Sequence, residues 1–133
     1  MNRLRDEATR CRLLIVDEDR RNFDELRDMF NDMGYECEVA LDGETARSIL
    51  DERLMDMVIV NAAVAAGREE QLVRDFKQAD PRMRVVLFNG TSKKTEQRRL
   101  RRLGAASCLS KASDLKAVVR AVERALDGGT GGR

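Results

Sequence analysis

The sequence predicts an α/β domain in which a doubly wound, five-stranded parallel sheet lies between two layers of helices. Two observations predict this class: five short apolar runs recur along the 133 residues, and a helical pattern of apolar residues follows each run. Strands that alternate with helices in this way pair in parallel, because parallel neighbours need helical crossovers. The run at residues 57–60 is continuously apolar, as a strand buried on both faces is.

The five runs give the expected strands in chain order. They are residues 12–16 (RLLIV), 35–40 (YECEVA), 57–60 (MVIV), 85–88 (VVLF) and 107–109 (SCL). Sheets of this kind place their sites at the carboxyl ends of the strands, where the strand order reverses. The residues directly after each run are therefore the candidates for function.

Apolar residues at three- and four-residue spacing predict a helix after each strand. The first helix face is Phe23, Leu26, Phe30 and Met33, closed by Gly34, and the second is Ala46, Ile49, Leu50 and Leu54, after Asp42 and Gly43. The third is Leu72, Phe76 and Ala79, and the fourth is Leu100 and Leu103, ended by Gly104. The fifth is Leu115, Val118, Val119, Val122 and Leu126, with Ser113 as the expected N-cap and Gly128 and Gly129 as the stop.

The length suits one domain, expected over residues 1–127, followed by a flexible glycine-rich tail at 128–133. Charged residues make up 37% but leave a net charge of only +1, so no global field attracts nucleic acid or an anionic membrane. Residues 1–10 contain no signal-peptide core, and no run approaches the roughly 20 apolar residues that span a bilayer. We therefore expect a cytoplasmic protein without membrane contact.

Histidine is absent, and the three cysteines, Cys11, Cys37 and Cys108, form no CxxC pair. Without histidine there is no serine–histidine or cysteine–histidine nucleophile pair and no histidine-ligated zinc. An odd number of unpaired cysteines is typical of reduced thiols in the cytosol. We expect no disulfide framework and no enzymatic activity.

Polar residues follow four of the five strands. Asp17-Glu18-Asp19 follows the first, Asn61 the third, Asn89-Gly90 the fourth and Ser110-Lys111-Ala112 the fifth. With these residues, LLIVDED resembles the first strand and acidic cluster of response-regulator receiver domains of two-component systems. GYECEVALDGETA resembles their second strand and the turn that follows it, and GAASCLSKA their fifth strand with its lysine. The resemblance runs from Arg12 to Leu126 and implies the chemotaxis-receiver-like, flavodoxin-like (βα)5 fold.

The resemblance also implies a chemistry that this chain departs from. In the family, an aspartate at the end of the third strand takes a phosphoryl group from phosphohistidine, and the acidic cluster holds Mg²⁺. The matching position is Asn61, and a neutral amide is a poor nucleophile and a weak cation ligand. We expect no aspartyl phosphate there, so the chain resembles an atypical receiver, a pseudo-receiver.

Asn61 alone could be a designed block or a residue that merely fills a strand end, but other departures accompany it. Asn89 matches the hydroxyl residue that ends the fourth strand, although Thr91 and Ser92 are close enough to leave the register open. Cys108 matches the aromatic switch residue of the fifth strand. Ala112 and Ala65 match two family prolines. Together these departures favour natural loss of the phosphorylation switch.

Asp17, Glu18 and Lys111 remain from the pattern that the resemblance implies. One interpretation is a residual Mg²⁺ pocket with Asp17 and Glu18 as weak ligands. We favour the other, a structural ion cluster in which Lys111 pairs with the acids, because the loss of the third carboxylate lowers affinity for Mg²⁺. No cofactor is therefore expected.

The fourth helix carries a basic face formed by Lys94, Arg98, Arg101 and Arg102. Like charges at four-residue spacing destabilise an isolated helix by a few tenths of a kcal/mol per pair, which a partner can offset, although a solvated face partly relieved by Glu96 is an alternative. In the family this helix, the fifth strand (with Cys108) and the fifth helix engage partners. We expect a protein partner with an acidic surface here, keep a homodimer as an alternative, and do not expect nucleic acid.

Two other functions are compatible with the same architecture. A nucleotide- or ligand-binding regulatory domain would need a phosphate loop after the first strand, where DEDRRN is acidic. A receiver phosphorylated at a non-standard carboxylate, such as Asp17 or Asp19, would still take up phosphate. Our preferred hypothesis is a phosphorylation-independent protein-interaction module in bacterial signal transduction.

Overall fold

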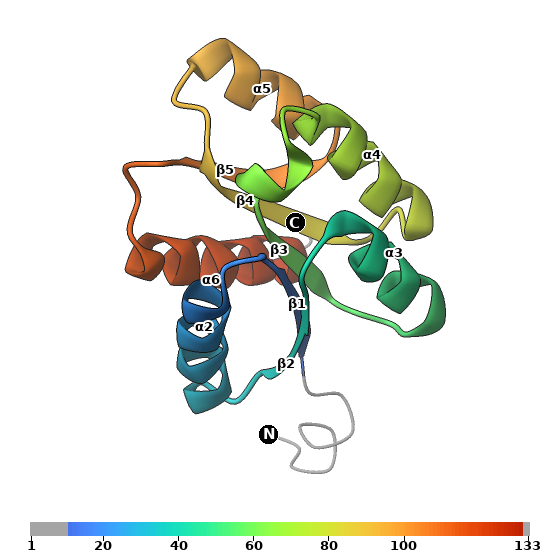
Figure 1. The fold of residues 1–133 in the computed structure, drawn as a ribbon, viewed down its shortest axis with the longest axis vertical. Helices are drawn as coiled ribbons and strands as arrows, with labels where there is room; N and C mark the ends of the chain where they lie inside the picture. Colours follow the sequence, from blue (N-terminus) through green and yellow to red (C-terminus); the bar gives the residue numbers. More distant parts are fainter. Residues whose placement is uncertain (1–10, 132–133) are drawn as a thin grey trace.

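The computed structural model describes residues 11–131, with side chains placed for residues 11–127, and contains one five-stranded sheet (Figure 1). The strands are β1 (Arg12–Val16), β2 (Glu36–Ala40), β3 (Met57–Asn61), β4 (Arg84–Gly90) and β5 (Ala105–Ser110). Their order across the sheet is β2-β1-β3-β4-β5, and every neighbouring pair is parallel. The order reverses between β1 and β3, so the switch point lies at the carboxyl ends of these two strands.

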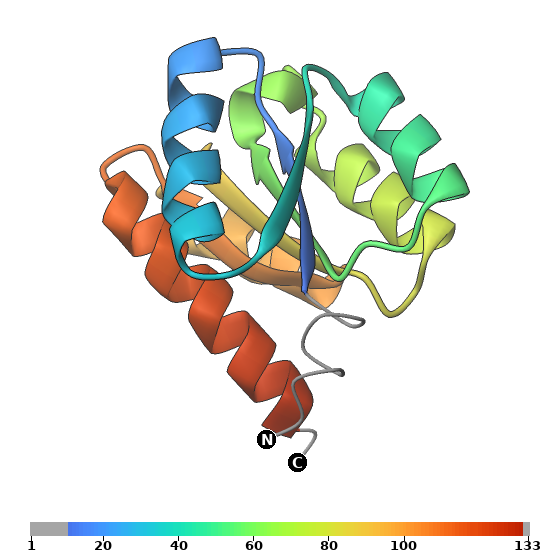
Figure 2. The same cartoon turned by 90° about the horizontal axis from the view of Figure 1, so that it is seen from below.

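The helices form two layers, one on each face of the sheet (Figure 2). They are α2 (Arg20–Asp32), α3 (Gly43–Glu52), η1 (Ala62–Ala65), α4 (Glu69–Ala79), α5 (Lys94–Arg102) and α6 (Leu115–Gly131). The residues of α2 and α6 pack in one hydrophobic cluster, and those of α3, α4 and α5 pack in the other. The predicted three-layer, doubly wound α/β fold is confirmed.

The side-chain alternation of the strands separates the two clusters. In β1, Leu13 and Ile15 pack against α2 and α6, whereas Leu14 and Val16 face α3 and α4. The five residues of β3 are all buried, which agrees with the apolar character of its first four residues. Within residues 11–131, none of the helices combines the length and the apolar character that crossing a membrane requires.

The structure corrects the predicted ends of three helices. Met33 and Leu54 lie beyond the ends of α2 and α3, are 39% and 80% exposed, and do not belong to the apolar helix faces predicted from spacing. Helix α6 continues to Gly131 rather than stopping at Gly128. The prediction for residues 1–10 lies outside the described residues, and the flexibility of the tail stays a prediction.

The N-cap of α6 is Asp114 rather than the predicted Ser113. The Asp114 carboxylate accepts a hydrogen bond from the Ala117 N–H at 2.9 Å. Its main-chain carbonyl oxygen accepts from the N–H groups of Ala117 and Val118. A carboxylate at this position also interacts favourably with the helix dipole, so it serves the cap better than a hydroxyl group one residue earlier.

This difference gives a stability prediction. Asp114→Ala should lower the free energy of unfolding by about 1 kcal/mol, the usual contribution of an N-cap side chain. Ser113→Ala is the matched control and should change it by less than about 0.5 kcal/mol. Urea unfolding followed by circular dichroism measures both values. Equal losses in the two variants would contradict the assignment of the cap.

Candidate functional site

The candidate site lies at the carboxyl ends of β1 and β3, at the switch point of the sheet. Asp17 directly follows β1 and is fully buried, and Asn61 ends β3 and is 5% exposed. Asn61 lines a cavity of about 630 Å³ that also borders α2 and the start of α6. The site is therefore a buried pair of polar side chains, one of which borders an open groove.

The Asn61 side chain makes three hydrogen bonds that use both ends of its amide. Its Nδ2 donates to Asp17 Oδ2 at 3.2 Å. Its Oδ1 accepts from Asn89 Nδ2 at 3.0 Å and from the Ala63 N–H at 2.9 Å. The last bond makes Asn61 the N-cap of η1. A carboxylate could accept the last two bonds, but only an amide can also donate to Asp17.

Asp17 is a buried carboxylate whose hydrogen-bond donors are neutral. The Asp19 N–H donates to Oδ1 at 2.9 Å, and Asn61 donates to Oδ2. Within the described part of the chain, no lysine or arginine lies within ion-pair distance of Asp17. A buried charge without hydrogen bonds is costly, so the Asn61 amide supplies stabilisation that an ion would otherwise give.

The other two acids of the cluster point elsewhere. Asp19 is the N-cap of α2, and its Oδ1 accepts from the Arg21 N–H at 3.0 Å and from the Asn22 N–H at 3.4 Å. Glu18 is exposed. The acidic cluster therefore does not converge, because one carboxylate is buried, one caps a helix and one is in solvent.

Asn89 is held in a backbone conformation that suits asparagine. Its φ is 59°, in the left-handed region, which asparagine tolerates better than most residues other than glycine. The pairing of β4 with β5 shifts register between Leu87 and Gly90, so Asn89 occupies an irregularity of the ladder. The side chain of Asn89 reaches Asn61, whereas the Thr91 hydroxyl accepts from the Lys93 N–H. The Asn89 side chain, and not the Thr91 hydroxyl, therefore reaches the candidate site.

Lys111 does not join the site. Its side chain is exposed, and among residues 11–127 no acidic group lies within 4.0 Å of its ammonium. It lines a separate cavity of about 440 Å³ with Gly90, Thr91 and Ala112. The predicted ion cluster of Lys111 with Asp17 and Glu18 is therefore wrong: the acids are hydrogen bonded or solvated, and the lysine is exposed without an acidic partner among the described residues.

The oxygen ligands at this edge do not fit a Mg²⁺ site. Mg²⁺ requires oxygen ligands near octahedral positions at about 2.0–2.1 Å. Asp17 and Asn61 are engaged with each other, and Asp19 is engaged with the first turn of α2. Among the residues that the structure describes, no group of three or more acidic or cysteine side chains is close enough to share an ion.

The four predicted basic residues of the interaction face lie together on α5. Lys94, Arg98, Arg101 and Arg102 are all exposed, and Leu100 points into the core. Cys108 of β5 is half-buried and packs at the edge of the core, with its Sγ 3.9 Å from the Gln97 carbonyl oxygen. Burial raises the pKa of the Cys108 thiol. It therefore supports α5 from beneath instead of lying on the exposed face.

Two features of this region were missed in the sequence. Arg99 also belongs to the basic helix, and it is paired with Glu70 of α4 at 2.6 Å. Lys93, directly before α5, is exposed as well. The run KKTEQRRLRR contains both residues, but the spacing alone does not show that Arg99 turns toward α4 while its neighbours face solvent.

Comparison with known proteins agrees with the fold and the order of these elements. The family model of the response regulator receiver domain matches residues 13–123. The sensor histidine kinase RcsC of Salmonella typhi is 28% identical over 106 residues, which are 80% of this chain and 11% of the relative. RcsC of Salmonella typhimurium is 28% identical over 99 residues, 74% of this chain and 10% of the relative. The chain thus spans about a tenth of the length of these curated relatives.

Solved structures share the fold at low sequence identity. A CheY-like receiver domain protein of Methanospirillum hungatei has a TM-score of 0.81 at 17% identity and covers 93% of this chain and 99% of its own. CheY4 of Vibrio cholerae has a TM-score of 0.77 at 17% identity, with 87% and 98% covered. A response regulator of Burkholderia pseudomallei, which carries a phosphorylated aspartic acid and a calcium ion, has a TM-score of 0.74 at 15% identity, with 90% and 71% covered.

The family match extends from the first residues of β1 to the middle of α6, and the observed strand order is that of the expected receiver fold. The chain belongs to the response regulator receiver domain family, within two-component signalling.

Proposed function

We propose that this receiver domain is a pseudo-receiver: a protein-interaction module of two-component signal transduction that works without phosphorylation and without enzymatic activity. The observation that carries the proposal is the hydrogen bond from Asn61 Nδ2 to the buried Asp17 carboxylate. The amide takes the place of the nucleophile and is itself a donor to the acid. The hydrogen-bonding groups of Asp17 and Asn61 therefore find their partners within the protein.

Three further features support the loss of the switch. The third carboxylate needed around a cation is absent, and Asp19 caps α2. Lys111 forms no ion pair with Asp17. Cys108 has no aromatic ring to move between a buried and an exposed position, and it is already packed under α5. A phosphoryl group at this site would lack a nucleophile, a bound cation and an aromatic side chain that changes position on phosphorylation.

The basic face of α5 is the surface that we assign to a protein partner. Lys94, Arg98, Arg101 and Arg102 are exposed without an ion pair inside the described part of the molecule. Such a face attracts an acidic protein surface through long-range steering. A random nucleic acid is less well matched, because the chain has a net charge of only +1 and 4% aromatic residues.

The first test concerns phosphoryl uptake. Incubation with Mg²⁺ and acetyl phosphate should leave the intact mass of the chain unchanged, because Asn61 offers no carboxylate nucleophile. Mass spectrometry of the intact protein provides the readout. A hydroxylamine-labile adduct of one phosphoryl group would contradict the proposal, and peptide mapping would then distinguish Asp17 from Asp19 as the acceptor.

The second test restores the carboxylate. Asn61→Asp should lower the free energy of unfolding at neutral pH by about 1–3 kcal/mol, because two buried carboxylates then face each other and the donor to Asp17 is lost. Protonation of the introduced carboxyl group would remove one of the two facing charges and restore a donor to Asp17, which favours the folded state at low pH. Stability relative to the parent should therefore fall as pH rises from about 4 to about 7.

Asn22→Asp is the matched control for this variant, because Asn22 lines the same groove without entering the hydrogen bonds of Asn61. It should show no comparable pH dependence. Acetyl phosphate and Mg²⁺ are added to both variants in the same series, and the backbone chemical shifts of α5 should stay unchanged in both. Large phosphorylation-dependent shifts in α5 of Asn61→Asp would show that the switch survives.

The third test concerns the basic face. Changing Arg98 and Arg102 to Glu should leave the unfolding free energy within about 0.5 kcal/mol of the parent, because exposed charges contribute little to stability. Capture of the native partner from cytosol should fall at least about tenfold, and binding by the parent should weaken as salt rises.

The matched control is Arg74→Glu with Arg82→Glu, two exposed arginines of α4 and its following loop that change the net charge equally. This pair should bind as the parent does. Partner binding that survives the α5 reversal would overturn the assignment of the face. Direct binding of random duplex DNA with a steep inverse salt dependence would show a nucleic-acid function instead.

A further inference from the structure

The net charge of +1 conceals a large separation of charge along the chain. Residues 24–56 contain eleven acidic and three basic residues, a net charge of −8. Residues 93–127 contain ten basic and four acidic residues, a net charge of +6. These two segments supply β2 and β5, which are the two edge strands of the sheet. The fold therefore places segments of opposite net charge at opposite edges of the sheet.

The arrangement of helices preserves this separation. Helices α2 and α3 flank β2 and β1 on the two faces of the sheet, and α5 packs beside β5. Figure 1 shows β2 near the lower end of the molecule and α5 at the upper end. An acidic edge and a basic edge thus lie at opposite ends of one small domain.

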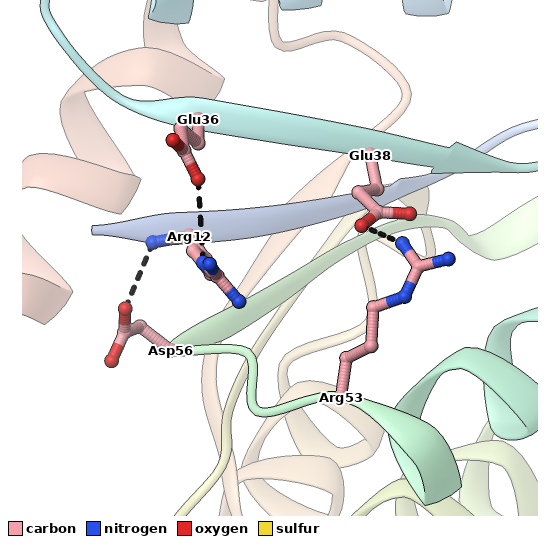
Figure 3. A network of polar contacts seen from close by, with 5 residues as sticks. All are labelled: Arg12, Glu36, Glu38, Arg53 and Asp56. Carbon is pink, nitrogen blue, oxygen red and sulfur yellow. Dashed lines mark hydrogen bonds and ion pairs between the residues drawn. The ribbon is translucent and has the colours of Figure 1, made fainter. Parts of the chain in front are cut away.

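The basic residues at the acidic end are all engaged in local ion pairs. Arg53 pairs with Glu38, and Arg12 pairs with Glu36 and donates its main-chain N–H to Asp56 (Figure 3). The other two basic residues of the segment are paired on their own helices: Arg27 with Asp24 at 2.7 Å and Arg47 with Asp51 at 3.3 Å. No cation of residues 24–56 is left to neutralise the remaining acids.

Unpaired charges of one sign remain at each end. The acidic edge is defined by four exposed residues of α2 and α3, and the basic edge by five exposed residues at α5. The acidic edge is Asp28, Asp32, Glu44 and Glu52; the basic edge is Lys93, Lys94, Arg98, Arg101 and Arg102. Within residues 11–127, none of the nine has an ion-pair partner.

The acidic end also carries apolar surface. Met33, Leu41 and Leu54 are the exposed large hydrophobic residues among the described side chains, and all three belong to the acidic segment. They lie just after α2, just after β2 and just before β3. They add exposed apolar area to the acidic segment.

We propose that the basic edge of one copy of this chain binds the acidic edge of a second copy. The inference rests on the proposed function, in which α5 is the contact surface. It identifies the acidic partner as a second copy of this chain. Because the two edges lie at opposite ends, the contact is heterologous and leaves one free edge of each sign. Association is then head-to-tail and open-ended rather than a closed dimer.

Sedimentation velocity of the full chain tests this association. At low salt, about 20 mM, the weight-average mass should rise above the 15.1 kDa monomer as concentration increases. At about 500 mM salt it should return to the monomer, because exposed ion pairs are screened. A constant monomer mass throughout the low-salt series would overturn the proposal.

Charge reversal at either edge identifies the surfaces. Arg98→Glu with Arg102→Glu, or Glu44→Lys with Glu52→Lys, should each weaken self-association at least about tenfold, because like charges then meet. An equimolar mixture of the two variants should associate again, since one retains the acidic edge and the other retains the basic edge. Loss of association only in the α5 variant would show a different contact and overturn the proposal.

Two control pairs separate local charge from net charge. Arg74→Glu with Arg82→Glu, and Glu18→Lys with Glu123→Lys, change the net charge equally at exposed positions outside both edges. Both should self-associate as the parent does, and a loss in either would show a net-charge effect instead. The outcome is independent of the phosphoryl-uptake assay. If binding of a native partner requires α5 but neither Glu44 nor Glu52, this inference fails and the proposed function still stands.

Discussion

The arrangement of the site depends on one constraint: Asp17 is a fully buried carboxylate that must be compensated. Its compensation comes from neutral donors, the Asn61 amide and the Asp19 N–H. Because Asn61 also accepts from Asn89 and Ala63, this one side chain links the ends of β1, β3 and β4 to the start of η1. Hydrogen bonds from neutral donors therefore join three strand ends through one side chain.

The fold was predictable because its signals are local and redundant. Each strand of the sheet is a short apolar run, and each helix has an apolar face with three- and four-residue spacing. The errors lie at helix ends, where apolar spacing continues past the last turn, as at Met33 and Leu54, or where two capping residues are adjacent, as at Ser113 and Asp114. There, the choice depends on backbone angles and hydrogen bonds that composition does not contain.

The site was predictable only in part. The strand order brings Asp17, Asn61 and Asn89 together, as expected from residues that follow parallel strands. The absence of an ion pair between Lys111 and Asp17 was not predictable, because spacing along the chain does not fix where a long side chain ends. The charge separation was present in the sequence from the beginning, but the total of +1 concealed it. Only the strand order shows that the two charged segments lie at opposite edges.

The left-handed backbone of Asn89 has a consequence for substitutions at this edge of the sheet. Its φ of 59° is one that asparagine tolerates and that strains a β-branched threonine. A variant with a threonine hydroxyl at this position would therefore have to change the backbone path at the end of β4 as well as the side chain. The main chain, and not only the side chain, limits which polar groups can face Asn61.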